Sequence, residues 1–114
     1  MRLALLILLC LLWATTISHA ATTRYVSTTG SDSNSCALST APGSNAKRSL
    51  NGTGGAIQCM LAGDTLILQD GTWNEQIGDT QGEAPGSKRP PSGVSWNQPT
   101  VIRAENPRKA TINK

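Results

Sequence analysis

The sequence predicts an all-β protein built as a solenoid, in which short strands stack coil on coil. Short candidate strands follow one another between tight turns, one long loop interrupts them, and few apolar residues are available to form a core. With 114 residues, the chain holds at most one small domain. A TIM barrel is excluded because that fold needs roughly 200 residues or more.

Residues 1–20 have the three parts of an export signal. A basic second residue precedes an apolar run at residues 3–13, and the small residues Ser18 and Ala20 mark the expected cleavage site. The run is too short to cross a bilayer, which takes about 20 residues. Cys10 lies inside the run, which argues against a lipoprotein signal. We predict a secreted or cell-surface protein, with no membrane contact after cleavage; an uncleaved anchor is the alternative.

Residues 21–62 are predicted to form an N-terminal cap region with a short helix and a disulfide. A strand at residues 24–27 is followed by turn-forming residues at 29–34 and by a loop at 37–55. The next four apolar residues are spaced to share one face of a short helix: Ala56, Ile57, Met60 and Leu61. We expect this helix to end at Gly63.

Residues 63–114 are predicted to form the first coils of the solenoid. Four apolar runs are expected to be strands, at residues 65–68, 72–77, 100–104 and 110–113. A long exposed loop, rich in Gly and Pro, occupies residues 78–99. The chain stops inside the last strand pattern, and folded proteins normally cover an open strand edge. We therefore expect the protein to continue beyond Lys114.

Cys36 and Cys59 are the two cysteines outside the export signal. An exported protein meets an oxidising environment, and two cysteines allow one intramolecular pairing. Closing this loop stabilises the fold by about 3 kcal/mol in the chain-entropy model. A catalytic thiol or a metal site would need a histidine partner, and His19 leaves with the signal. We predict a structural disulfide that ties the helix to the loop after the first strand.

Several motifs recur in the order seen in one known superfamily. In residues 63–77 a glycine–aspartate turn precedes an apolar strand, and then come a glycine, an aromatic residue and a glutamate. Together with residues 25–34, 92–104 and 110–112, this pattern resembles the opening of secreted right-handed parallel β-helix proteins of the pectate-lyase-like superfamily. The resemblance covers nearly all of residues 24–113. It implies a right-handed parallel β-helix, of which this chain holds the N-terminal cap helix and the first coils only.

The resemblance also implies a function in extracellular polysaccharide metabolism or recognition. Such proteins include polysaccharide lyases, glycoside hydrolases and non-catalytic surface proteins. In the lyases, calcium-binding carboxylates and a basic catalytic residue lie on later coils, and no position of this chain matches them. We therefore expect an exported protein that acts on or binds polysaccharide, with the catalytic coils missing from this chain and this chain inactive alone. The sequence itself identifies no cofactor, and it is the resemblance that allows calcium in the full-length protein. The alternative is a non-catalytic surface or adhesive protein that binds glycans.

Three carboxylates are candidates for glycoside chemistry, namely Asp70, Glu75 and Asp79. Acid–base cleavage needs two carboxyl groups roughly 5–9.5 Å apart. Bonds to neighbouring backbone groups explain Asp and Glu at these positions more simply. The oxygens of residues 32–34 alternate as in a calcium loop, but the terminal glutamate and the glycine pattern of that loop are missing. We therefore assign no catalytic residue and no metal ligand, and predict a turn at 32–34.

Aromatic and basic residues complete the candidate list. Trp73 is expected to pack inside the first coil, while Trp96, in the long polar loop, is the candidate for contact with a sugar. Lys47-Arg48 and Lys88-Arg89 are isolated pairs in a chain of formal charge +3, so we expect no nucleic-acid partner. Asn51-Gly52-Thr53 has the form of a glycosylation acceptor, a motif too short to be informative.

Overall fold

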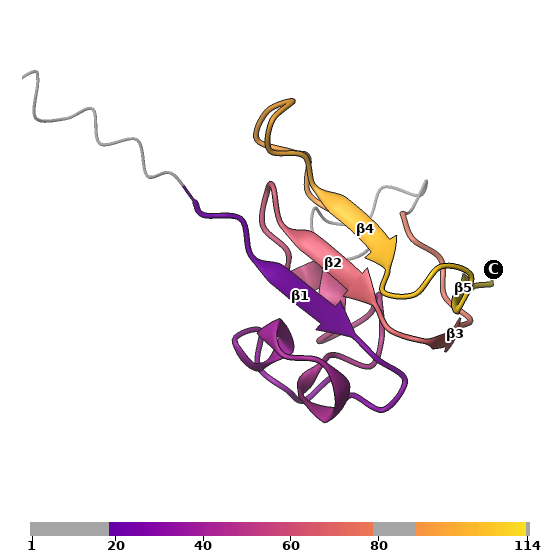
Figure 1. The fold of residues 1–114 in the computed structure, drawn as a ribbon. Helices are drawn as coiled ribbons and strands as arrows, with labels where there is room; N and C mark the ends of the chain where they lie inside the picture. The colour runs from indigo at the N-terminus through magenta and orange to yellow at the C-terminus, as the bar shows by residue number, and fades with distance from the viewer. Residues whose placement is uncertain (1–18, 79–88, 114) are drawn as a thin grey trace, which may run out of the picture.

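The structure, a computed structural model, describes residues 19–78 and 89–113. Its strands form two small parallel sheets (Figure 1). The first sheet has the order β1-β2-β4, and the second pairs β3 with β5. The five strands are β1 (Thr23–Val26), β2 (Thr65–Leu68), β3 (Gly71–Trp73), β4 (Val101–Ala104) and β5 (Ala110–Ile112).

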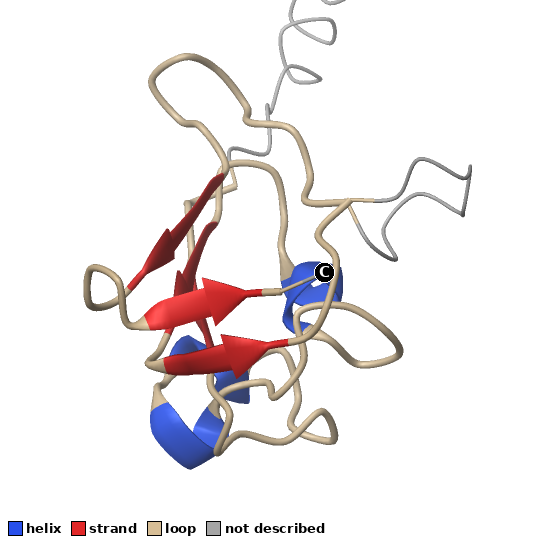
Figure 2. Cartoon of the chain, turned by 90° about the vertical axis from the view of Figure 1, so that its right-hand side faces the viewer, coloured by secondary structure: helices blue, strands red, loops and turns tan. Residues whose placement is uncertain are grey.

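The two sheets meet at a corner, because short turns lead from one into the other. Residues 69–70 connect β2 to β3, and residues 105–109 connect β4 to β5. Figure 2 shows the second pair of strands turned away from the direction of the first sheet. Parallel register aligns Thr65 with both Thr23 and Val101, and Gly71 with Ala110.

Three short 3-10 helices lie between β1 and β2. They are η1 (Leu38–Thr40), η2 (Gly43–Asn45) and η3 (Ala56–Cys59). The expected helix is therefore present as η3, but it is a single 3-10 turn that ends before Gly63. Met60 already has extended backbone angles, φ −75° and ψ 139°, which stop the helix. Gly55 before η3 is also extended, and glycine is a poor helix former.

One hydrophobic core serves both sheets. Its buried members come from the first sheet, from η3 and its approach, and from the second sheet: Val26, Leu50, Ala56, Ile57, Met60, Leu66, Leu68 and Trp73. Partly buried Ile77, Ile102 and Ala110 pack against this group. Leu66, on the central strand β2, has no exposed surface. The core therefore lies under the middle of the three-stranded sheet.

The prediction of a right-handed parallel β-helix is wrong for the described residues. The structure has two small parallel sheets of three and two strands, and no solenoid. The connections between its strands do not repeat. Residues 27–64, between β1 and β2, carry the three 3-10 helices, whereas the described part of residues 74–100, between β3 and β4, carries no helix or strand. The described residues contain no α-helix that could form the predicted N-terminal cap. At the position of the predicted cap helix lies η3, which is a 3-10 turn. Short parallel strands are shared by both folds, and the local pattern alone could not distinguish them.

Most of the predicted export signal lies outside the described residues, as do Cys10, Asp79 and Lys88. In residues 19–78 and 89–113, no helix is both long and apolar enough to cross a membrane.

Candidate functional site

The turn before β4 presents a tryptophan whose side chain is fully exposed. Trp96 has a relative exposure of 101%. At the base of the turn, Ser95 and Gln98 form an antiparallel bridge. The N–H of Gln98 donates to the Ser95 carbonyl at 3.1 Å, and the N–H of Val94 donates to the Gln98 carbonyl at 3.0 Å. These bonds hold Trp96 and Asn97 at the tip of an ordered turn.

Side-chain bonds attach this turn to the rest of the molecule. Thr100 Oγ1 accepts the N–H of Gly63 at 2.9 Å and donates to the carbonyl of Ser92 at 3.1 Å. Gln98 Nε2 donates to the carbonyl of His19 at 3.2 Å. The turn that carries the exposed indole is therefore fixed to the segments at the N-terminal end of β2.

An open hollow of about 360 Å³ lies beside the exposed indole. Its lining consists of Gly93, Ser95, Trp96, Pro99 and Thr100. The indole and the proline ring supply apolar surface, and the serine and threonine supply hydroxyl groups. An aromatic face next to a few polar groups can bind the apolar C–H face of a sugar ring while hydrogen-bonding its hydroxyls.

Trp73, in contrast, is a core residue, as the sequence predicted. Its side chain is 3% exposed, and Nε1 donates to the carbonyl of Arg48 at 2.9 Å. A second hollow of about 360 Å³ adjoins it, lined by Thr28, Arg48, Ser49, Thr72, Trp73, Asn74 and Glu75. Because this indole is covered, the second hollow does not offer the stacking surface found at Trp96. Tyr25 is half-buried on β1.

The carboxylates considered for glycoside chemistry bind different parts of the chain. Asp70 Oδ1 accepts a bond from Asn106 Nδ2 at 3.0 Å. Glu75 accepts the backbone N–H groups of Leu50 at 3.2 Å and Asn51 at 2.8 Å. Asp79 lies outside the described residues. The two described carboxylates therefore hold loops in place, each with its own partners.

The predicted turn at residues 32–34 is present, and its aspartate organises a second segment. Asp32 Oδ1 accepts the N–H groups of Arg48 at 3.0 Å and Ser49 at 2.9 Å, and Oδ2 accepts the Ser49 hydroxyl at 2.6 Å. Burial alone would raise the pKa of Asp32, but these bonds and the charge of Lys47 lower it below its ordinary value. In the described part of the chain, no group of three or more His, Cys, Asp or Glu could hold a metal ion.

Asp64 is a buried carboxylate, although the sequence pattern predicts only that it lies in a turn. It has no exposed surface. It accepts the N–H groups of Leu61 and Thr22, both at 2.9 Å, together with Arg24 Nε at 3.2 Å and His19 Nε2 at 3.0 Å. Burial works to raise the pKa of Asp64, but the two backbone bonds and the two side chains lower it below its ordinary value. The Gly-Asp dipeptide before an apolar strand was the available signal for this role.

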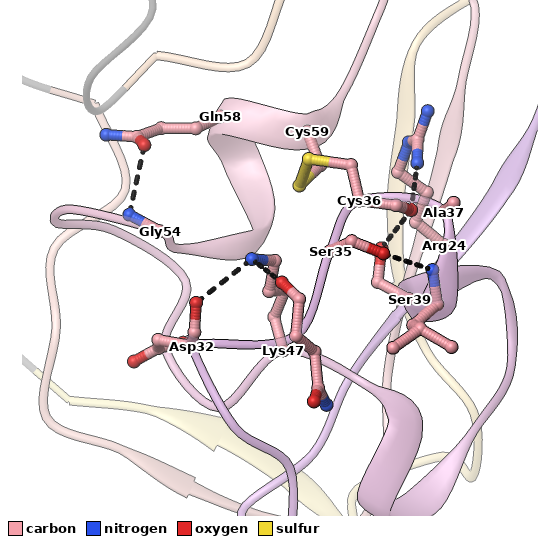
Figure 3. Close-up of a disulfide and its surroundings, with 12 residues drawn as sticks. Arg24, Asp32, Ser35, Cys36, Ala37, Ser39, Lys47, Gly54, Gln58 and Cys59 are labelled. Atoms are coloured by element: carbon pink, nitrogen blue, oxygen red, sulfur yellow. Dashed lines mark hydrogen bonds between the residues drawn. A yellow bond between two sulfur atoms is a disulfide. The ribbon is translucent and has the colours of Figure 1, made fainter.

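The predicted disulfide between Cys36 and Cys59 is confirmed (Figure 3). It joins the segment before η1 to the last residue of η3, with the two Cα atoms 5.3 Å apart. The carbonyl of Cys36 also accepts bonds from Arg24 Nη1 at 2.7 Å and from the Ser39 hydroxyl at 2.9 Å. A structural disulfide is compatible with an extracytoplasmic protein, because such bonds persist in oxidising compartments.

The chain matches no protein-family model, no curated protein and no solved structure. The resemblance to the pectate-lyase-like superfamily is therefore not supported by these comparisons, and we transfer no residue role from it.

Proposed function

We propose that this chain is an exported protein that binds extracellular polysaccharide through the turn carrying Trp96. The fully exposed indole is the observation that carries the proposal. Exposing a whole indole to water forgoes the large apolar burial that tryptophan usually contributes. An ordered turn that nevertheless presents it, beside an open hollow with hydroxyl groups, favours a role in recognition.

Two further features support an extracellular setting. Residues 1–20 have the pattern of an export signal, and the chain contains a disulfide. Polysaccharides are abundant ligands outside the cell and offer sugar faces that stack on aromatic rings. Binding without catalysis is the form of the proposal that the described residues favour, because Asp70 and Glu75 are each bonded to a different loop.

The test is binding of the purified, oxidised chain to a panel of soluble neutral and acidic polysaccharides. Affinity electrophoresis and quenching of tryptophan fluorescence would report binding. We expect W96A to weaken binding about tenfold, since loss of one stacking contact costs on the order of 1 kcal/mol or more. The fold should not change, because the Trp96 side chain makes no buried contact.

Val94→Ala is the matched control. Val94 lies in the same turn and is 58% exposed, so its truncation removes exposed apolar surface without touching the indole. We expect V94A to bind like the wild type. Equal binding by wild type and W96A across the panel would contradict the proposal. Release of unsaturated or reducing sugar by the wild type would instead show a catalytic activity.

A further inference from the structure

The chain enters the fold just after the point where the export signal is expected to be cut. The expected cleavage lies between Ala20 and Ala21. Both residues are exposed and belong to no helix or strand, so the peptide bond between them is open to a protease. Strand β1 begins only two residues later, at Thr23. Cleavage would therefore leave a short N-terminal arm of two residues on the folded chain.

The two oxygens of Asp64 bind groups on both sides of this peptide bond. Oδ1 is bonded to His19 Nε2 at 3.0 Å and accepts the N–H of Thr22 at 2.9 Å. Oδ2 accepts Arg24 Nε at 3.2 Å and the N–H of Leu61 at 2.9 Å. Cleavage removes His19 and leaves the other three bonds in place. Oδ1 of this buried carboxylate then has one partner instead of two.

The same cleavage creates a cation that can replace the histidine. Water adds its hydroxyl to the carbonyl carbon of Ala20 and a proton to the nitrogen of Ala21, and this amine takes a second proton near neutral pH. Three covalent bonds join this nitrogen to that of Thr22, so the two lie no more than about 4 Å apart. The N–H of Ala21 donates no hydrogen bond to the described residues. Rotation about the Cα–C bond of Ala21 therefore turns the ammonium toward Oδ1 without breaking a bond.

We propose that the export signal is removed after Ala20 and that the resulting α-ammonium of Ala21 binds Asp64. The new N-terminus then takes the place of His19 and becomes part of the fold. An ammonium–carboxylate bond is charge-assisted, and such bonds are roughly twice as strong as neutral ones. The inference rests on the export part of the proposed function and is independent of polysaccharide binding at Trp96.

Binding to Asp64 gives the new amino group a proton affinity that can be measured. Arg24 and His19 are the charged or titratable side chains that the described residues bond to Asp64. His19 leaves with the signal, a guanidinium keeps its charge, and Gln98 from the turn before β4 does not titrate. The pKa of Asp64 lies below its ordinary value, so the carboxylate is ionised at neutral and alkaline pH. It should therefore raise the pKa of the α-amino group above its ordinary value of about 8.

The first measurement is the N-terminus of the secreted protein. The full chain is expressed with residues 1–20 in a secreting host, and the product is analysed by intact mass and N-terminal sequencing. We expect a chain that starts at Ala21. An uncleaved product, or one cut at another bond, would overturn the proposal.

The second measurement is the rate of acylation of the α-amino group of the secreted chain, followed by peptide mapping across a pH series. A peptide of residues 21–26 is the reference. Only the free amine reacts, so the midpoint of the profile reports the pKa. At pH 7 we expect the folded chain to react about tenfold more slowly than the peptide, the factor that corresponds to one charge-assisted hydrogen bond. Steric shielding would slow the reaction equally at every pH and leave the midpoint unchanged.

The matched control is a Gly-Ser insertion between Ala20 and Ala21, which moves the new amino group two residues away from Asp64. We expect its midpoint to equal that of the peptide. D64N in the secreted chain should have the same effect, with circular dichroism reporting its fold; if D64N does not fold, the insertion variant decides. A secreted chain with the midpoint of the peptide would overturn the proposal, as would a raised midpoint that persists in the insertion variant or in folded D64N.

Discussion

At the scale of single residues, the side chain of Asp64, directly before β2, is held by several bonds. Its carboxylate is fully buried and accepts bonds from two backbone N–H groups, from Arg24 and from His19. These bonds link β1 and the residues before it to the turn before β2, two segments about 40 positions apart in sequence. Asp64 therefore fixes the start of the β1–β2 pairing.

We predict that Asp64→Asn lowers the free energy of unfolding by about 3 kcal/mol, because the nearly buried guanidinium of Arg24 then loses its charge partner. The pKa of Asp64 is lowered in the fold, so its ionised form adds stability above the pKa of the unfolded chain, near pH 4. This stability is lost as the pH falls through the folded pKa. Urea unfolding of wild type and D64N from pH 7 to pH 2 measures both effects.

Asp70→Asn provides the comparison, because Asp70 is exposed and has a single side-chain partner, Asn106. We expect D70N to change stability by no more than about 0.5 kcal/mol. The difference in stability between wild type and D64N should shrink toward low pH, where both side chains are uncharged. A difference that stays constant from pH 7 to pH 2 would contradict the role given to the ionised carboxylate.

At the scale of elements, residues 27–64 show how a long connection with little regular structure is held. Polar side chains bind backbone groups far along the chain: Asp32 binds Arg48 and Ser49, and Glu75 binds Leu50 and Asn51. Lys47 is 4% exposed, and its ammonium donates to the carbonyl of Asp32 (Figure 3). The same ammonium also donates to the carbonyl of Asn34. The disulfide is the covalent part of the same arrangement.

Close packing of this connection also explains a glycine. A Cβ atom at Gly30 would lie 2.5 Å from the carbonyl oxygen of Ala46 and 2.6 Å from that of Lys47. The sequence predicts that this glycine lies in a turn-forming stretch. The structure shows that the nearby backbone of residues 46–47 leaves no room for a side chain there.

We predict that C36A/C59A lowers the free energy of unfolding by about 3 kcal/mol, since the unfolded chain regains the entropy of a loop with a sequence separation of 23. Reduction of the wild type should have an effect of similar size. Urea unfolding with and without a reductant measures both. The double variant should be insensitive to reductant, which controls for other effects of the reagent. Equal stability of the oxidised wild type and the double variant would show that the hydrogen bonds alone hold this connection.

At the scale of the whole molecule, one core unites the two sheets. Leu66 on β2 and Trp73 on β3 belong to the same buried cluster, although they lie in different sheets. Only short turns join the two sheets at their corner (Figure 2). Neither sheet can therefore lose its packing without exposing the core that both share. We therefore expect the described regions to unfold together.

We predict that Leu66→Ala lowers the free energy of unfolding by about 3 kcal/mol, through lost burial and the cavity left behind. Urea unfolding followed by circular dichroism and by tryptophan fluorescence should give coincident transitions in the wild type and in L66A. Leu61→Ala, at a residue that is 52% exposed, should change stability by no more than about 0.5 kcal/mol. Separate transitions for the two signals in the wild type would contradict a shared core.

Local pattern was enough to place most strands. Residues 65–68 were predicted and observed as a strand. β4 and β5 each differ from their predicted ranges by one residue at one end, and β1 is shifted by one residue toward the N-terminus. β3 is the exception: it ends at Trp73, while the prediction ran to Ile77. Glu75 in that stretch binds the backbone of the Leu50 segment, a contact that no local pattern could reveal.

The sequence by itself determined most of the strands, the cysteine pairing, the burial of Trp73 and the choice of Trp96 as the candidate binding residue, because these follow from local composition and from the small number of cysteines and tryptophans. Only the tertiary structure decided how the strands assemble into two sheets, that the helix is a 3-10 turn, and that Asp32, Asp64 and Glu75 serve as anchors. The physical reason is the separation in sequence over which each interaction acts. Strand propensity acts between neighbours in sequence, whereas sheet order and buried carboxylates depend on hydrogen bonds between segments that come together only when the chain folds.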